Sequence, residues 1–596
     1  MSNKTLRLFV VFFSSFISIT SSSQNPSLKT SENKEWIVKS NSYTKILIDI
    51  DEKYSPEFGS TQGLALYDTL IAIPTLANKN AARKDKENAL ILLKEAKQKE
   101  TNIKIRQDLD ILINSTELNF RKEDFELNRE VPFFNPSSTI FDGIKTLLDD
   151  QTPVERRNAA IIRLSKYAGL QNGYLPLTDV LKERTIEQIK KADMIYPSKQ
   201  QMDVILSHNG SLVDGIRELF VKYKMNGWQE IYEAVKKQLE EYDQWIKNNV
   251  LPRGRTDFRL PPEEYKLALE GYGIDIPPDE IAKMAHDAFT DIQQQMKPLA
   301  EQIAKKYNLS SGDYRSVMKF LKKDQIIGDS ILPLYKAHLV IIEDIIRKQQ
   351  LVTLPGRPAV IKIATAAETA QQPAPHMVRP PFLNNTGQRG VFVLPMNLPP
   401  APGEKLDKYD DFTFDAASWT LIAHEVRPGH ELQFDKMVEE GVSQARTLYA
   451  LNSTNTEGWG LYSEYITRPY MPIEGQLVSL DYRLLRAARA FLDPELQAGT
   501  ITPQQALNIL MVDVVSSHAF AQQEVERYTL RAPGQANSYF YGFTKMLSLR
   551  KDTEQALGAK FKPVRFHDFI LSQGILPPAL IREAVTSEFV PAEKMR

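Results

Sequence analysis

A Pro-Gly pair that separates two histidines in residues 423–433, AHEVRPGHELQ, is the strongest constraint on this fold. His424 and His430 are six residues apart, so on an unbroken helix their side chains would point about 240° apart. Pro428 clashes with the carbonyl four residues back, and Gly429 tolerates unusual dihedral angles. We therefore expect the helix to bulge, kink or end at this pair, which can bring His430 back beside His424.

The two histidines and a glutamate in residues 456–464, TEGWGLYSE, form a ligand set typical of a catalytic zinc site. Zinc binds imidazoles and carboxylates, and catalytic sites keep three protein ligands and one open position for water. We interpret His424, His430 and Glu457 as the ligands of one Zn²⁺ per chain, and Glu425 as the general base. A surface or capping pair of histidines is the alternative interpretation, and Mn²⁺, Co²⁺ or Fe²⁺ could occupy the same ligands.

Other carboxylates could orient the ligating imidazoles, as is common behind metal sites. Glu464 lies seven residues after Glu457, on the same face of a helix, and is either a second-layer partner or itself a ligand. Asp435, Asp493 and Glu524 are further candidates. For each of them, a solvated surface charge is the alternative.

Residues 517–542 supply groups that could contact a substrate. A hydrolase needs a donor for the developing oxyanion, and we expect Tyr539 first and His518 second to fill that role. Arg527 could hold a substrate carboxylate bidentately, although a structural ion pair is equally consistent with the sequence. Core packing is the alternative for the tyrosine and the histidine.

The sequence GVFV at residues 390–393 is typical of a β-strand. It lies about thirty residues before the histidine motif, the place at which zincin-type folds have an edge strand, so the resemblance of the motif to those folds implies that Val391 and Val393 belong to such a strand. Such a strand can bind an extended peptide by backbone pairing. A plain core strand is the alternative.

The rest of the chain predicts a mainly α-helical protein with a small β-sheet next to the helix of the histidines. Residues 36–350 carry apolar residues at three- and four-residue spacing, whereas 351–364 and 390–395 are rich in Val, Ile and Phe. Helical patterns then resume near Asp415. We expect residues 24–350 to form one wall of a cleft and 351–596 to form the catalytic region.

Residues 1–23 have the pattern of a secretory signal peptide, with Lys4 and Arg7 before an apolar run that is too short to span a membrane. The sequence therefore predicts export, to the periplasm or the medium, with no integral membrane span after signal removal. The oligomeric state stays open. The chain has no cysteine, which excludes disulfides, thiol chemistry and lipid attachment through a cysteine.

The charges are balanced, with 74 basic and 75 acidic residues, so nothing in the composition indicates a nucleic-acid partner. The chain has no glycine-rich phosphate loop, no GxSxG elbow and no dinucleotide fingerprint. The predicted partner is a peptide or a small amide substrate.

The segments AHEVRPGHELQ, TEGWGLYSE and PGQANSYFYG resemble a bacterial family of mostly exported proteins classed as a domain of unknown function. That family is grouped by its HExxPGH motif with the zincin-like metallopeptidases. The resemblance implies a mainly helical zincin-like fold and a peptidase-type site at His424, Glu425, His430 and Glu457, but no substrate. Gln497 stands where the family pattern has a histidine, which puts the substrate chemistry in doubt.

We therefore expect an exported zinc metallopeptidase that hydrolyses oligopeptides by a metal-activated water. The same ligand set could serve an amidase or esterase that acts on a non-peptide substrate. A peptide-binding protein that has kept the fold and lost catalysis is the third interpretation, and the intact Glu425 argues against it.

Overall fold

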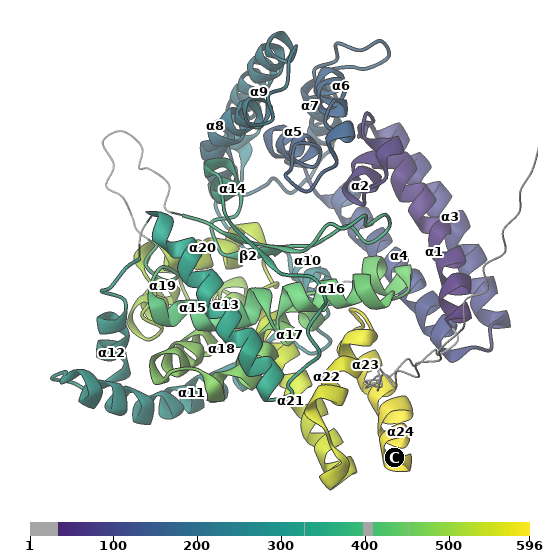
Figure 1. The fold of residues 1–596 in the computed structure, drawn as a ribbon. Coiled ribbons are helices and arrows are strands. Elements are labelled where there is room, and N and C mark those ends of the chain that lie inside the picture. Colours follow the sequence, from purple (N-terminus) through teal and green to yellow (C-terminus); the bar gives the residue numbers. More distant parts are fainter. Residues whose placement is uncertain (1–33, 327, 397–408, 451) are drawn as a thin grey trace, which may run out of the picture.

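A computed structural model describes residues 34–326, 328–396, 409–450 and 452–596 (Figure 1). The predicted signal peptide, residues 1–23, lies outside these residues. No helix in the described ranges is both long enough and apolar enough to cross a bilayer. The fold is mainly α-helical, as predicted, with one small sheet.

The first helices, purple in Figure 1, pack around a small core of their own that includes Leu47, Leu93 and Leu109. They are α1 (Glu35–Tyr54), α2 (Pro56–Thr61), α3 (Leu76–Lys99) and α4 (Ile103–Arg129). Asn102 caps the start of α4 by accepting hydrogen bonds from two backbone N–H groups of its first turn. Arg446 ties this group to the C-terminal part of the chain, because its Nε donates to Asp108 Oδ1 at 2.7 Å.

A second group of helices has a separate core, with Phe141, Leu164, Ile216 and Tyr242 at its centre. Its helices are α5 (Pro136–Lys145), α6 (Ala159–Tyr167), α7 (Leu177–Ile189), α8 (Lys199–Lys222) and α9 (Gln229–Asn249). They lie at the top of Figure 1, away from the yellow C-terminal helices.

The largest core joins residues on both sides of position 350, where the sequence predicted the boundary between its two regions. Before that position it includes α10 (Pro262–Gly271), α11 (Pro278–Tyr307), α12 (Tyr314–Leu321) and α13 (Ile331–Lys348). After it come α15 (Asp415–Leu421), α16 (His430–Glu440), α17 (Ser453–Thr467), α18 (Ile473–Ala498), α19 (Pro503–Val512), α20 (His518–Glu526), α21 (Asn537–Leu557), α22 (Pro563–Ser572), α23 (Pro578–Ala584) and α24 (Val590–Met595). The short helix α14 (Ala366–Gln371) instead packs on α8, and its Ala367 belongs to the second core. Helices α11 and α18 pack along each other, and α17 packs on α21.

The sheet has three strands, β1 (Val360–Ile363), β2 (His376–Val378) and β3 (Val391–Leu394), in the order β1-β3-β2. Strand β3 pairs in parallel with β1 and antiparallel with β2, and all four of its residues are buried. The prediction that Val391 and Val393 belong to an edge strand is therefore wrong. Their sequence is uniformly apolar because the strand is covered on both faces and paired on both sides.

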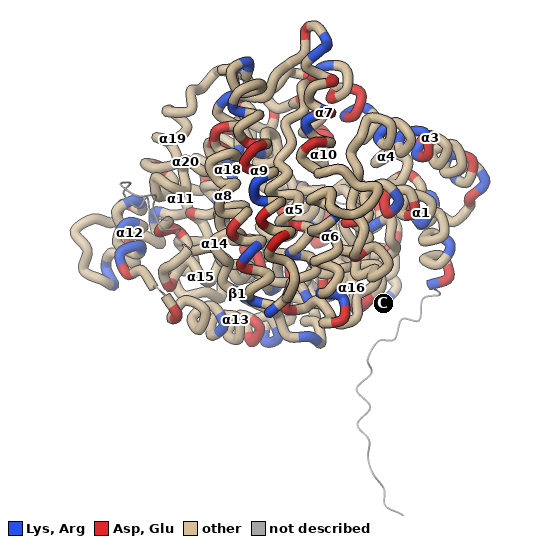
Figure 2. The backbone as a smooth tube through the Cα atoms, turned by 90° about the horizontal axis from the view of Figure 1, so that it is seen from above, with Lys and Arg blue, Asp and Glu red and all other residues tan. Residues whose placement is uncertain are grey.

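Charged residues of both signs are interspersed on the face shown in Figure 2, for example along α3 and around α7. Ion pairs between neighbouring helices include Lys94 of α3 with Glu117 of α4. This face carries no continuous band of one sign.

Candidate metal centre

The helix that enters the histidine motif ends there, as the Pro-Gly pair predicts. Helix α15 continues into one wide π-helical turn, Ile422–Val426, which carries His424 and Glu425, and α16 begins at His430. A Cβ at position 429 would lie 1.7 Å from the carbonyl oxygen of His424. Only glycine therefore allows the chain to turn so tightly between the two histidines.

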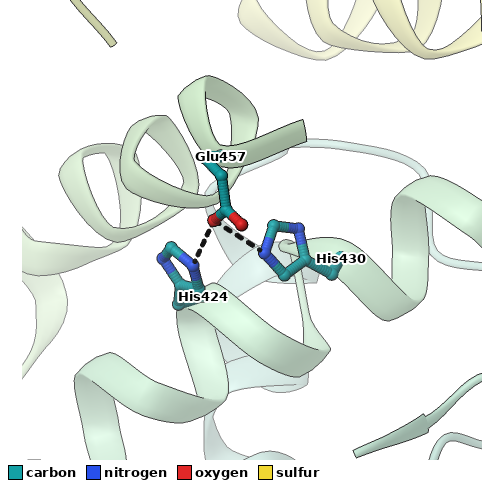
Figure 3. A group of neighbouring side chains, drawn as sticks. All are labelled: His424, His430 and Glu457. Atoms are coloured by element: carbon teal, nitrogen blue, oxygen red, sulfur yellow. Dashed lines mark ion pairs between the residues drawn. The ribbon is translucent and has the colours of Figure 1, made fainter. Parts of the chain in front are cut away.

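The three predicted ligands converge from separate elements, with the Glu457 carboxylate between the two imidazole rings (Figure 3). Glu457 Oε2 lies 3.3 Å from His424 Nε2 and 3.4 Å from His430 Nε2. One ligand atom from each of the three residues falls within 4.8 Å of the other two. Two imidazole nitrogens and a carboxylate oxygen at one point are the donor set of a divalent transition metal.

Two glycines of α17 make this convergence possible. A Cβ at Gly460 would lie 2.6 Å from Cε1 of His424, so the imidazole ring occupies the space of the missing side chain. Gly458 lies against Gly542 of α21, which lets the two helices approach closely. Between the glycines, Trp459 Nε1 donates to the carbonyl of Pro428 at 2.9 Å and fastens the Pro-Gly turn to α17.

Glu464 holds the far side of the His424 ring, and its carboxylate is not one of the three groups that converge. His424 Nδ1 donates to Glu464 Oε1 at 2.7 Å, and Thr420 Oγ1 donates to the other carboxylate oxygen at 3.0 Å. Burial by itself would lower the pKa of His424, but the neighbouring carboxylates of Glu457 and Glu464 outweigh it and raise that pKa to about 9. The negative charges of Glu457 and Glu464 on the two sides of the ring would also stabilise a bound cation.

Glu425 is 7% exposed and faces the same cavity as the three ligands. Its Oε2 is buried and makes no hydrogen bond within the described chain. Burial raises the pKa of the Glu425 carboxyl, although the neighbouring His424 and His430 oppose that rise. A carboxylate with a free oxygen beside the ligands has the position that a general base requires.

The ligands lie in a cavity of about 470 Å³ that Tyr539 and Arg527 also line. The Tyr539 ring stacks on His424 with 6.3 Å between the ring centroids. Its hydroxyl accepts a hydrogen bond of 2.9 Å from Arg527 Nη2. Burial raises the pKa of Tyr539, so the phenol keeps its proton for donation into the cavity.

The structure does not bring His518 to this cavity. It is the first residue of α20, it is exposed, and it is absent from the described lining. The outer strands of the described sheet are β1 and β2, and His376 and Met377 of β2 line the cavity.

The other predicted carboxylates serve other partners. Glu524 binds Arg489 through two hydrogen bonds of 2.6 and 2.7 Å. Asp493 accepts from the Tyr265 hydroxyl, and Asp435 accepts weakly from the backbone of Gly390.

Gln497 also lies outside the cavity and has a structural role. Its side-chain oxygen accepts from the Leu260 N–H at 2.8 Å, and its nitrogen donates to the carbonyl of Tyr528 at 2.8 Å. The departure from the family pattern at this position therefore does not alter the lining.

Sequence reasoning missed three arginines of the lining, Arg379, Arg486 and Arg489. Arg486 and Arg489 lie one turn apart on α18, and both are almost fully buried. The available signal was the stretch DYRLLRAARAFLD, in which arginines recur every third residue within an apolar helix. Arginine is rarely buried without an ion-pair partner or a functional role.

The expected N-terminal wall is small. Among the described residues before position 350, only Gly271 and Tyr272 line the cavity. The remaining described lining comes from the segment around β2, from Phe412, from the π-helical turn, and from α15, α16, α17, α18, α20 and α21 with residues that flank them. The helices of residues 34–250 thus lie outside the site.

Residues 56–585 match a family described as "Bacterial protein of unknown function (DUF885)". No curated protein matches the chain. Among solved structures, a "putative lipoprotein" from Colwellia psychrerythraea is similar at a TM-score of 0.73 and 17% identity, covering 94% of this chain and 98% of that one. A "putative lipoprotein of unknown function" from Shewanella oneidensis has a TM-score of 0.68 and 17% identity, covering 91% of this chain and 99% of the other. These likenesses show a shared fold.

Proposed function

The chain belongs to the DUF885 family of bacterial proteins of unknown function, and from its metal-ligand cluster we propose that it is an exported zinc-dependent peptidase with a zincin-like site. The observation that carries the proposal is the convergence of His424, His430 and Glu457 beside the buried Glu425. The predicted signal sequence and the description of both similar structures as lipoproteins support export.

The residues present fit a zinc ion. Two imidazoles and one carboxylate are a known catalytic donor set, and the cavity leaves room for a fourth ligand. Buried Glu457 Oε2 makes no hydrogen bond within the described chain, and a bound cation would satisfy it. Glu464 fixes the tautomer of His424 that presents Nε2 to the ion.

A zinc ion held here would supply Lewis acidity at the substrate carbonyl. Glu425 removes a proton from the attacking water as its oxygen bonds to the carbonyl carbon. Tyr539 donates its phenolic proton in a hydrogen bond to the oxyanion, and its contact with Arg527 holds the hydroxyl in place. The carbon–nitrogen bond then breaks, and Glu425 transfers the proton to the leaving amine.

The lining also suits an extended peptide. The outer edge of β2 is unpaired in the described sheet, and its residues His376 and Met377 border the cavity. A peptide strand can pair with such an edge through its backbone, independently of side-chain sequence. This supports peptides over small non-peptide amides as substrates.

Metal content of the purified protein is the first test. We expect about one zinc per chain, and its loss in both His430→Ala and Glu457→Ala variants. Glu241→Gln on the exposed face of α9 is a control that should keep the metal. Zinc retained without His430 would overturn the ligand assignment.

Hydrolysis is tested with a mixed oligopeptide library, read by mass spectrometry with and without chelator. We expect zinc-dependent cleavage that falls by at least about 10²-fold in Glu425→Gln, since a general base contributes about 10²–10⁴-fold. Cleavage of ester or amide substrates without peptide cleavage would favour the amidase or esterase alternative. Peptide binding without any cleavage would indicate a binding protein.

A further inference from the structure

Four arginines share the cavity with the candidate metal ligands: Arg379, Arg486, Arg489 and Arg527. Among the described residues of the lining, the only carboxylates are Glu425 and Glu457, and both already have roles in the proposed mechanism. A mechanism of hydrolysis needs one oxyanion donor, so this number of cations is not explained by catalysis alone.

Arg489 and Arg527 lie on the two sides of one shared acid. Glu524 accepts both hydrogen bonds from Arg489, through Nε and Nη2, and its Oε1 is 3.6 Å from Arg527 Nη1. All three side chains are largely buried, and one carboxylate cannot neutralise two guanidinium groups. One positive charge therefore remains in this part of the lining.

The excess charge lies one aromatic ring away from the ligands. The guanidinium carbons of Arg489 and Arg527 are 4.6 and 5.1 Å from the centre of the Tyr539 ring. That ring stacks on His424. An anion held by these arginines would therefore sit next to the reacting carbonyl, within the reach of one residue of a bound peptide.

Arg379 extends the positive lining toward the segment of β2. Within the described chain it makes no hydrogen bond and no ion pair, and its guanidinium carbon is 5.9 Å from the centre of the Phe434 ring. An arginine that keeps all its donors is ready to bind a carboxylate in a bidentate way.

We propose that the cavity selects peptides that carry a carboxylate within one residue of the scissile bond, bound by Arg527 with help from Arg489 and Arg379. This deepens the proposed peptidase function and rests on it for the position of the scissile bond. The carboxylate has two possible sources, the free C-terminus of a short peptide and an aspartate or glutamate side chain. The first would make the enzyme an exopeptidase, and the second an endopeptidase with acidic preference.

Binding tests this inference without requiring catalysis. The zinc-loaded Glu425→Gln protein is mixed with an equimolar pool of random tetrapeptides in free-acid and C-terminally amidated forms. Retained peptides are identified by ultrafiltration and mass spectrometry. We expect at least tenfold enrichment either of free acids over amides or of Asp and Glu over Asn and Gln, and the arm that shows it names the source.

Arg527→Gln, made in the Glu425→Gln protein, should abolish the enrichment, and Arg527→Lys should restore part of it because the charge returns without the planar fork. Arg582→Gln on α23, whose partner Asp552 is on α21, is the matched control and should leave the enrichment unchanged. Arg379→Gln tests the contribution of the exposed arginine separately from that of the buried ones. It also provides a second variant, outside the buried cluster, if Arg527→Gln is unstable.

Equal retention of free acids and C-terminal amides together with equal retention of Asp or Glu and Asn or Gln peptides would overturn the carboxylate subsite, and so would no retention of any peptide. Neutral peptides that are cleaved in the library assay while acids show no advantage would leave the peptidase proposal intact and reject only this inference. Enrichment of acidic peptides without cleavage by the active protein would support the carboxylate-binding site and reject the peptidase proposal.

Discussion

His424 is held from both sides by carboxylates: Nδ1 donates to Glu464 Oε1 at 2.7 Å, while Nε2 lies 3.3 Å from Glu457 Oε2. The first contact fixes the tautomer, so that the lone pair of Nε2 points to the cavity when the imidazole is neutral. The second brings a carboxylate oxygen to the same point. The ring is thus oriented before any ion binds.

Glu464→Gln should weaken zinc binding by about 10- to 100-fold, because a neutral amide holds the imidazole less firmly and makes it a weaker ligand. Competition with a fluorescent chelator measures this affinity. Glu241→Gln, on an exposed helix face, should bind zinc as the unmodified protein does. An unchanged affinity in Glu464→Gln would show that the contact does not tune the site.

Gly460→Ala should also weaken zinc binding, because the new Cβ would lie 2.6 and 2.8 Å from Cε1 and Nε2 of His424. The ring cannot move away without losing Glu464, so we expect a loss of roughly tenfold or more. Far-UV circular dichroism should be unchanged.

Gly210→Ala in the middle of α8 is the matched control for this substitution. No atom outside its own helix lies within 4 Å of a Cβ at that position. The variant should bind zinc normally and gain about 0.5–1 kcal/mol of stability, since alanine favours a helix interior over glycine. Equal zinc affinity in the two variants would contradict the steric argument at Gly460.

The sequence predicted that His424, His430 and Glu457 come together, because a stretched histidine spacing with a Pro-Gly pair between the histidines can still bring the two rings side by side. Whether the three residues bind a metal stays a prediction. The helical class also followed from periodicity, which needs no tertiary information.

The sequence could not predict the order of the strands, or which buried face of a helix lines the cavity. GVFV reads as a strand in either a central or an edge position, and only the pairing of β3 with β1 and β2 decides between them. The arginines of α18 face the site because α18 packs against the elements around it, and periodicity does not show which buried face meets a cavity. The prediction for His518 missed for the same reason, because periodicity does not show that this residue is exposed while Phe520, on the same helix, lines the cavity.

Arg446→Met should destabilise the protein by about 3–5 kcal/mol, because it leaves Asp108 charged and buried without its partner. Arg446 also donates to Gln107 and Gln573, at 3.1 and 3.0 Å, so it joins α4 to the C-terminal helices. Urea unfolding measures the change. Adding Asp108→Asn to Arg446→Met should recover part of the loss, whereas simple additivity of the two variants would contradict a coupled pair.

His567 should make the stability of the protein fall as the pH drops from about 7 to 4. Burial, together with the nearby Arg550, lowers the pKa of this imidazole to about 4, although the hydrogen bond to the Leu351 carbonyl opposes that shift. Its Nδ1 donates to the Leu351 carbonyl at 2.6 Å, and its Nε2 accepts from the Tyr462 hydroxyl at 2.7 Å. Protonation of Nε2 would break its hydrogen bond with the Tyr462 hydroxyl, because a protonated nitrogen cannot accept. It would also place a positive charge in a buried site.

The unfolded chain takes up this proton near pH 6.5 and the folded chain only near pH 4, so acid favours unfolding between these values. At pH 5 the difference amounts to about 2 kcal/mol relative to pH 8. In metal-free protein, His567→Gln keeps one donor and one acceptor but does not titrate. Its free energy of unfolding should therefore fall by about 2 kcal/mol less than that of the unmodified protein over the same range. Exposed His286→Gln is the control. Equal pH dependence in His567→Gln and the unmodified protein would mean that His567 does not stay neutral in the fold.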